Sequence, residues 1–220
     1  MGWTSAGAYA NDVRAVDTQV APLYAKYKAM DPKAVAADPQ AHAMGERLFL
    51  SYCAQCHGSD AGGSKGFPSL RDTDWLYGGE PEAIRESITN GRNGIMPPFG
   101  SVLGDDGVKN TVSYVRSLSG LAHDSLRAQL GKPLFVQNCA ACHGLDGKGN
   151  QALGAPNLTD KIWLWGGTDA AIVETVTKGR GAPGAVTRMP AHKDLLDDGK
   201  IQLLTAYIWG LSNGASAAAR

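Results

Sequence analysis

The sequence lacks several features that would assign it to common classes of protein. It has no continuous apolar run of about 18 residues, so no transmembrane helix lies within it. Its 21 basic and 21 acidic residues cancel, and the basic excess of a nucleic-acid-binding protein is therefore absent. Residues 1–30 have neither a basic start nor a continuous apolar stretch, and they do not resemble a secretory signal peptide. Alternating β-branched runs are scarce, so we expect the non-helical residues to be loops rather than strands.

Cysteine is also scarce, but its placement is informative. The only four cysteines form two Cys-x-x-Cys-His motifs, Cys53–His57 and Cys139–His143. This motif is typical of covalent haem attachment: two thiols add to the vinyl groups of the porphyrin, and the adjacent histidine binds the iron. The sequence therefore predicts two covalently bound haems c, attached through Cys53 and Cys56 and through Cys139 and Cys142, with His57 and His143 as proximal iron ligands.

Paired cysteines have two other common roles. Such a pair can be half of a zinc site or a redox dithiol, and two pairs can in principle share one zinc. Neither role requires a histidine after each pair. A dithiol of the thioredoxin type also belongs near a βαβ pattern, which the sequence does not show. The pattern favours haem.

Each motif is followed by a Met-Pro turn in a loop. Met96-Pro97 follows the first motif and Met189-Pro190 the second. The proline keeps the preceding residue extended, and a thioether sulfur suits the sixth position of an electron-transfer haem. We therefore expect Met96 and Met189 to be the sixth ligands, one for the haem of each half. The competing roles are a methionine that fills core space and replacement by His42, His123 or His192, of which only His192 lies near a Met-Pro turn.

The two halves are an internal repeat. Phe49 to Cys53 matches Phe135 to Cys139, Trp75-Leu76-Tyr77-Gly78-Gly79 matches Trp163-Leu164-Trp165-Gly166-Gly167, and Gly91-Arg92 matches Gly179-Arg180. Trp75 and Trp163 can donate an indole N–H to a haem propionate or pack in a core. Arg92 and Arg180 can bind a propionate or act as solvated cations at a helix C-terminus. The sequence does not decide between these roles.

Helix signals divide the chain into segments. We expect helices from Pro39 to Cys53 after the cap Asp38, from Pro81 to Gly91, from Asp105 or Asp106 to Leu118, from Thr168 to Gly179 and from Asp197 to Leu211. The predicted fold is mainly α, with two tandem cytochrome c-like domains. Residues 1–38 are an arm with an amphipathic helix from about Ser5 to Met30, 39–120 the first domain, 121–133 a linker, 134–212 the second domain and 213–220 a disordered tail.

The repeat, the two Trp-x-x-Gly-Gly elements, the segment Gly94 to Gly100 and the opening Gly2-Trp3-Thr4-Ser5 together resemble the subunit III (CcoP) family of cbb3-type cytochrome c oxidases. The resemblance extends from Gly2 to about Gly210. It implies electron transfer from a cytochrome c donor toward the other oxidase subunits, on the periplasmic face of the bacterial inner membrane. It also implies an N-terminal membrane anchor, which we expect to precede this chain.

Two other functions remain open from the sequence. A free periplasmic dihaem cytochrome would carry the same motifs without an anchor. A dihaem peroxidase would need an iron with an open position and acid–base groups above it, and two Met-Pro turns argue against that. The chain itself shows no catalytic site, although it would belong to an oxidoreductase complex.

Overall fold

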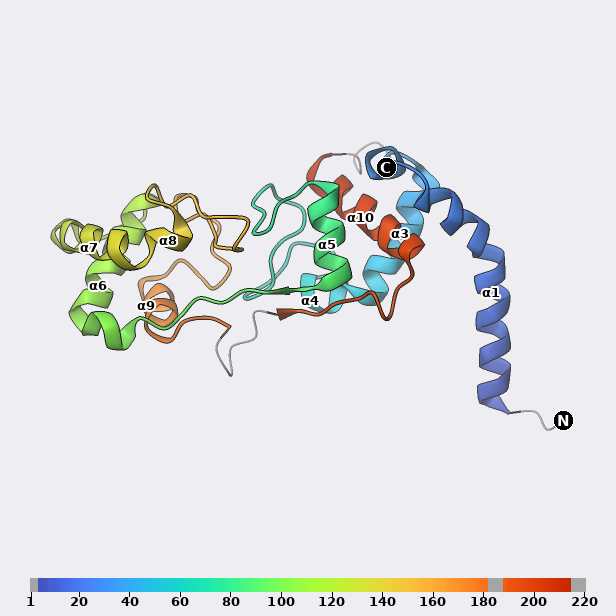
Figure 1. Ribbon diagram of the computed structural model, residues 1–220, viewed down its shortest axis with the longest axis horizontal. Coiled ribbons are helices and arrows are strands. Elements are labelled where there is room, and N and C mark those ends of the chain that lie inside the picture. The colour runs from blue at the N-terminus through green and yellow to red at the C-terminus, as the bar shows by residue number, and fades with distance from the viewer. Residues whose placement is uncertain (1–3, 182–187, 215–220) are drawn as a thin grey trace.

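The computed structural model describes residues 4–181 and 188–214, which form a mainly helical molecule of two units (Figure 1). The first unit lies next to the N-terminal helix and the second lies at the opposite end of the molecule. The first unit contains α2 (Pro32–Ala36), α3 (Pro39–Tyr52), α4 (Ala54–His57), α5 (Pro81–Asn90) and α10 (Asp198–Ser212). The second unit contains α6 (Gly100–Leu118), α7 (Ser125–Asn138), α8 (Ala140–His143) and α9 (Asp169–Lys178). The predicted mainly helical class is confirmed.

The arm predicted for the N-terminus is the helix α1 (Ser5–Lys28). Its C-terminal part packs on α10, where the side chain of Tyr27 is fully buried. The rest of the helix projects away from the two units (Figure 1). None of the helices in the described part of the chain is both long and apolar enough to cross a membrane.

Local capping explains most helix boundaries. Asp38 caps α3 by accepting hydrogen bonds from the backbone N–H groups of Gln40 and Ala41, and Asp197 caps α10 in the same way through Lys200. Pro81 is the first residue of α5, as predicted. Helix α6 has non-helical backbone angles at Gly104, so its main part begins at Asp105, next to the expected caps Asp105 and Asp106. The turn from Gly100 to Leu103 that precedes it was not predicted.

Each unit is built on a close crossing of two helices. In the first unit α3 meets α10 at Gly45, where a Cβ would lie 2.7 Å from Cβ of Tyr207. In the second unit α7 meets α6 at Gly131, where a Cβ would collide with the carbonyl oxygen of Asn110. Gly45 and Gly131 occupy equivalent positions in the repeat. The crossing is therefore the same in both units, and only glycine permits it.

The C-terminal helix of each repeat lies in the other unit. Helix α6 comes from the first repeat and packs on α7 and α9, whereas α10 comes from the second repeat and packs on α3 and α5. The first apolar core accordingly joins residues of α3 and α5 to residues of α10, among them Phe49, Ile84, Ile201 and Leu204. The second core joins Val108 and Val112 of α6 to Phe135 and Ile172.

Two short strands mark the place where the chain passes between the units. Strand β1 (Arg92–Asn93) pairs antiparallel with β2 (Arg188–Met189), with Arg92 opposite Met189. A further bridge joins Met96 to Arg180 through two backbone hydrogen bonds of 2.8 Å. Residues 91–99 leave the first unit here, and at roughly 3.3 Å per extended residue they can span about 30 Å. The strands were not predicted.

The packing of the helices does not follow the linear order of the repeats. The expected domains 39–120 and 134–212 describe the repeats along the sequence, whereas in the structure residues 100–118 and 188–212 each complete the core of the other half. The expected linker 121–133 contains the first part of α7, which begins at Ser125. Residues 215–220 of the expected disordered tail lie outside the described residues.

Candidate functional site

The first Cys-x-x-Cys-His motif lies where α3 ends and the short helix α4 begins. Cys53 is the C-cap of α3 and the N-cap of α4, and His57 is the last residue of α4. Burial, with a smaller contribution from Cys56, raises the pKa of the Cys53 thiol to about 11. Burial and the neighbouring Cys142 raise the pKa of Cys139 to about 11 in the same way. Both thiols are therefore protonated at neutral pH.

Both motif histidines are buried and held in one orientation. Nδ1 of His57 lies 2.9 Å from the carbonyl oxygen of Pro68, and Nδ1 of His143 lies 3.0 Å from that of Pro156. A carbonyl oxygen only accepts, so Nδ1 carries the proton and Nε2 keeps its lone pair. Burial lowers the pKa of both imidazoles, which favours the neutral ring. Each histidine therefore presents an unprotonated nitrogen suited to an iron.

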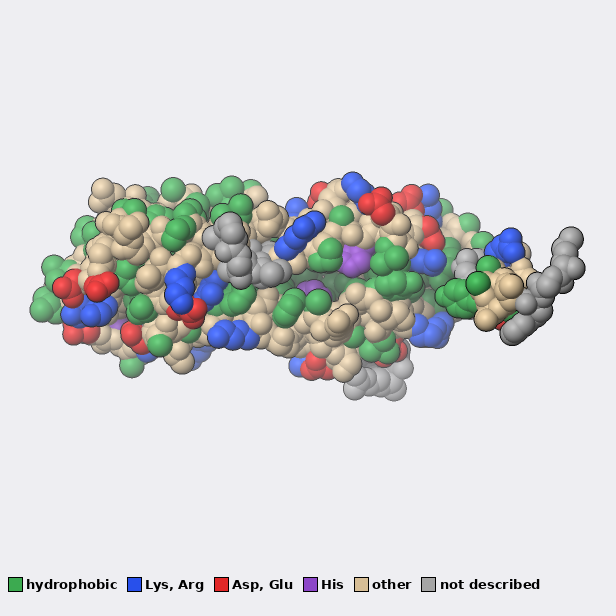
Figure 2. Space-filling view, turned by 90° about the horizontal axis from the view of Figure 1, so that it is seen from below, with side chains coloured by type: hydrophobic (Ala, Val, Ile, Leu, Met, Phe, Trp, Pro, Cys, Tyr) green, Lys and Arg blue, Asp and Glu red, His purple; other side chains and the backbone are tan. Residues whose placement is uncertain are grey.

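An apolar cavity lies beside His57. Figure 2 shows a hydrophobic hollow in the first unit with histidine side chains (purple) next to it. The cavity combines side chains from the first repeat with side chains from the far end of the chain: Cys53, His57, Leu70, Trp75, Ile84, Ser87, Ile88, Met189, His192, Leu204 and Ile208. The methionine in this cavity is Met189, which belongs to the second repeat in the sequence.

The second site shows the reciprocal arrangement. Met96, from the first repeat, packs against the core that contains Cys139, Val112 and Phe135. Trp163 packs against the same core, and its buried Nε1 has no hydrogen-bond partner among the described residues. An unpaired buried N–H is costly unless a further acceptor satisfies it. Trp163 thus has a donor available for a bound group.

Each Met-Pro turn packs directly against a glycine of the other repeat. A Cβ on Gly91 would collide with the carbonyl oxygen of Met189, and a Cβ on Gly179 would collide with that of Met96. Both glycines have positive φ, of 71° and 72°. Close packing and backbone conformation both require glycine at these positions. The expected pairing of each methionine with the motif of its own half does not match this geometry.

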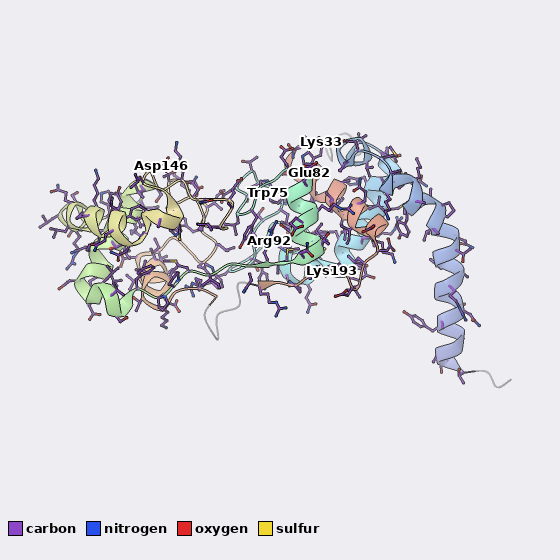
Figure 3. All side chains as sticks on the ribbon, viewed as in Figure 1. Lys33, Trp75, Glu82, Arg92, Asp146 and Lys193 are labelled. Carbon is purple, nitrogen blue, oxygen red and sulfur yellow. The ribbon has the colours of Figure 1, made fainter. Side chains whose placement is uncertain are left out.

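The two matched arginines have protein partners. Arg92 donates from Nε to Oγ of Ser87 at 2.9 Å, and Arg180 donates to Oγ1 of Thr175 at 2.7 Å. The Arg180 side chain is only 12% exposed, so it is not the solvated cation considered from the sequence. Figure 3 labels Trp75 and Arg92, which lie on the side of α5 turned toward the second unit.

The zinc and dithiol interpretations gain no support. The two cysteine pairs lie in different units, so one zinc cannot bridge them. Across residues 4–181 and 188–214, no three or more His, Cys, Asp or Glu side chains lie close enough together to form a metal site without a further ligand. All four cysteines fall within these ranges and none forms a disulfide.

Of the competing histidines, only His192 reaches the first cavity, where its buried Nδ1 has no partner among the described residues. His42 packs edge-on against Tyr207, and His123 is exposed. Sequence reasoning missed the carbonyl groups of Pro68 and Pro156, although their equivalence in the repeat was a usable signal. It also missed Tyr77 and Trp165, which stack on Arg92 and Arg180.

Comparison with known proteins gives consistent matches. The model of the family described as cytochrome C oxidase, cbb3-type, subunit III matches residues 40–115 and again residues 127–208. The chain is 49% identical over 221 residues to the cbb3-type cytochrome c oxidase subunit CcoP of Rubrivivax gelatinosus, covering all of this chain and 71% of that protein. It is 41% identical to the subunit FixP of Azorhizobium caulinodans, covering 97% of this chain and 76% of the relative. The two family matches agree with the predicted pair of tandem cytochrome c-like domains.

Proposed function

The chain belongs to the family of subunit III of cbb3-type cytochrome c oxidases, and on this premise we propose that it is a dihaem electron carrier. Membership makes it a cytochrome c subunit of that oxidase and implies covalently bound haem c. The proposal adds the number of haems, their ligands and the source of the electrons. One haem is attached at Cys53 and Cys56, and the other at Cys139 and Cys142.

The observation that carries the proposal is the reciprocal placement of the two methionines. Met189 lines the cavity of His57, and Met96 packs in the core that contains Cys139. We therefore assign His57 and Met189 to one iron and His143 and Met96 to the other. The donor set is that of a haem c: two thiols, a neutral imidazole and a thioether at each site. The apolar lining fits a porphyrin face.

The side chains perform a limited set of tasks in this function. When bound, haem supplies an iron that alternates between two oxidation states. The carbonyls of Pro68 and Pro156 orient the imidazoles, and the apolar linings exclude water. Ligation by one histidine and one methionine would leave no position for a substrate on the iron. This arrangement supports electron transfer and argues against the peroxidase alternative.

Trp163 and the two arginines have outer roles in the proposal. The unpaired Nε1 of Trp163 supports a hydrogen bond to a haem propionate, and Trp75 occupies the matching position in the first cavity. Arg92 and Arg180 keep N–H groups beyond those bonded to Ser87 and Thr175, and these can bind propionates.

The partners in this proposal are a cytochrome c donor and the other subunits of the oxidase, where oxygen would be reduced. We place the chain on the periplasmic face of the inner membrane, held there by an N-terminal anchor. Membrane fractionation of the full-length protein tests the anchor: it should stay in the membrane after a carbonate wash. Release into the wash would favour the free periplasmic cytochrome instead.

The haem count and the ligand pairing are tested together. The denatured protein should have the mass of the polypeptide plus two haems. In a variant with Cys139→Ala and Cys142→Ala, one haem should remain, with the far-red sulfur-to-iron band of methionine ligation. Met189→Ala should abolish this band and Met96→Ala should leave it. The opposite outcome would assign each methionine to its own half and overturn the pairing.

His192 is the specific competitor at the first site. In the same single-haem background, His192→Ala should leave the far-red band intact. Loss of the band or a changed ferric spectrum with His192→Ala, and an unchanged spectrum with Met189→Ala, would transfer the ligand role to the histidine.

A further inference from the structure

The two units meet at a notch that an aromatic ring of the second unit fills. Gly66 has a φ of +88°, and a Cβ there would lie 2.9 Å from Cη2 of Trp165. The backbone N–H of Gly66 also donates to the carbonyl oxygen of Leu164 at 2.8 Å. The ring of Trp165 thus packs against the backbone of Gly66, where the absence of a side chain leaves room for it. The hydrogen bond from Gly66 to the neighbouring residue Leu164 holds the ring in this position.

A matching notch lies on the opposite unit. A Cβ on Gly154 would collide with the ring of Tyr77, so Tyr77 of the first unit fills a gap in the second. Nε2 of Gln151 donates to the carbonyl oxygen of Trp75 at 3.0 Å and fixes the same loop. Tyr77 and Trp165 are equivalent in the repeat. The contact between the units is therefore reciprocal.

Each docked ring also stacks on an arginine of its own unit. The guanidinium carbon of Arg180 lies 4.4 Å from the ring centroid of Trp165, and that of Arg92 lies 4.7 Å from the ring centroid of Tyr77. Such cation–π pairs are most stabilising where water is excluded. Arg180, with 12% of its side chain exposed, meets that condition.

The same arginines lie beside the two methionines. Arg180 and Met96 exchange two backbone hydrogen bonds of 2.8 Å, and Arg92 is the register partner of Met189. A continuous series of contacts therefore runs from Gly66 through Trp165 and Arg180 to Met96. The equivalent series runs from Gly154 through Tyr77 and Arg92 to Met189.

We propose that Tyr77 and Trp165 are positioning residues for the axial methionines, so that contact between the two units supports methionine ligation at both irons. Trp165 supports Met96 at the second site, and Tyr77 supports Met189 at the first. Loss of either ring loosens one methionine and leaves the other in place. This inference rests on the proposed function, because it takes both methionines as iron ligands.

The test measures how readily imidazole displaces each methionine from the ferric dihaem protein. The coordinated methionine methyl groups give separate shifted NMR resonances, which Met96→Ala and Met189→Ala assign to their sites. In Trp165→Leu, the imidazole concentration that halves the Met96 resonance should fall roughly fivefold, as expected for a lost cation–π pair. The Met189 resonance of the same molecule is the internal control and should keep its wild-type midpoint. Tyr77→Leu should give the reverse pattern.

Two further variants distinguish a specific effect on the position of Met96 from a general loss of contact between the units. Trp165→Phe keeps an aromatic ring and should restore most of the wild-type midpoint. Arg180→Lys keeps the charge without the planar stack, so it should shift the Met96 midpoint as Trp165→Leu does, and the double variant should shift it no further. Equal shifts at both sites in Trp165→Leu, or none at either, would overturn the inference.

Failure of the underlying assignment gives a different result. If Met96→Ala removes neither shifted resonance, the proposed ligation itself is wrong. If Met96→Ala removes one resonance but Trp165→Leu leaves its midpoint unchanged, the ligation stands and only the positioning role is refuted.

Discussion

At the scale of single residues, glycine decides where the methionines can lie. Gly91 combines a φ of 71° with a ψ of −178°, a conformation available almost only to glycine, and it touches the turn that contains Met189. Gly104 has nearly the same backbone angles, 63° and 172°, but nothing lies within 4 Å of its missing Cβ. Gly104 is thus a matched control for Gly91: a substitution there introduces the same backbone strain without the close contact.

We expect Gly91→Ala to damage the first site far more than its backbone strain alone explains. Both Gly91→Ala and Gly104→Ala should lower the free energy of unfolding by about 1–3 kcal/mol through strain. Gly91→Ala should cost roughly a further 1–3 kcal/mol, because its Cβ collides with the carbonyl oxygen of Met189. Urea titration measures the free energy of unfolding, and the far-red band reports the methionine. Equal losses of unfolding free energy in the two variants would show that the Met-Pro turn does not pack against Gly91.

The cysteines and histidines of the candidate sites could be proposed from the sequence because their spacing is local. Five consecutive residues place two thiols and an imidazole on one short helix, whatever the rest of the chain does. The carbonyl groups that orient His57 and His143 lie 11 and 13 residues further along, and the repeat aligns Pro68 with Pro156. No such local rule specifies which methionine faces which histidine.

At the scale of helices, the exchange of α6 and α10 is the main departure from the linear repeat. Leu204 of α10 is fully buried and lines the cavity of His57. Val112 of α6 is fully buried in the core that contains Cys139. Each helix therefore completes the candidate site of the other repeat.

We expect Leu204→Ala to destabilise the first proposed haem site more than the second. The deletion of buried methyl groups should cost about 2–5 kcal/mol. The Met189 resonance should consequently be lost at lower urea concentration, with the Met96 resonance less affected. Val112→Ala should give the mirror result. If Leu204→Ala acted first on the haem attached at Cys139, α10 would belong to its own repeat and the exchanged packing would be wrong.

At the scale of the whole molecule, the exchange ties the two halves of the chain together. The residues Ala122 and His123 between α6 and α7 are exposed, so a protease site can be introduced there. A cut at this point gives fragments 1–122 and 123–220, each carrying one helix that completes the core of the other. We expect the cut protein to elute as one species in size-exclusion chromatography and to separate only in denaturant. Separate elution under native conditions would instead support two independent linear domains.

The contact between the units also includes a repulsion that depends on pH. Burial, followed by the carboxylates of Asp160 and Asp72, raises the pKa of Asp74 to about 6. Because this pKa is above its ordinary value of 3.8, the folded state favours the protonated form. The resulting stabilisation is complete below pH 3.8 and is lost as the pH rises through about 6.

We expect Asp74→Asn to be more stable than the wild type at pH 7 by about 1 kcal/mol, a value that allows for screening at a partly exposed carboxylate. The difference should vanish near pH 4. Thermal unfolding at pH 4, 5, 6 and 7 measures it. Asp72→Asn, which removes only a minor neighbouring charge, is the control. A constant difference across this range would assign the effect of Asp74→Asn to something other than its ionisation.

The sequence by itself determined the two Cys-x-x-Cys-His motifs, the helices that follow the caps Asp38, Thr168 and Asp197, and the presence of a repeat. These features depend on residues close together in the chain, where spacing and capping fix the geometry. The tertiary structure alone decided that Met189 lies with His57 and that Met96 packs with the core around Cys139. Because the two repeats are alike, the sequence pattern of α6 or α10 does not say in which unit the helix packs: the periodicity of a helix does not identify its partner. The exchanged arrangement depends on residues 91–99 passing between the units and on the contacts of Gly91 and Gly179 with the two Met-Pro turns. These contacts join segments about 90 residues apart in the sequence.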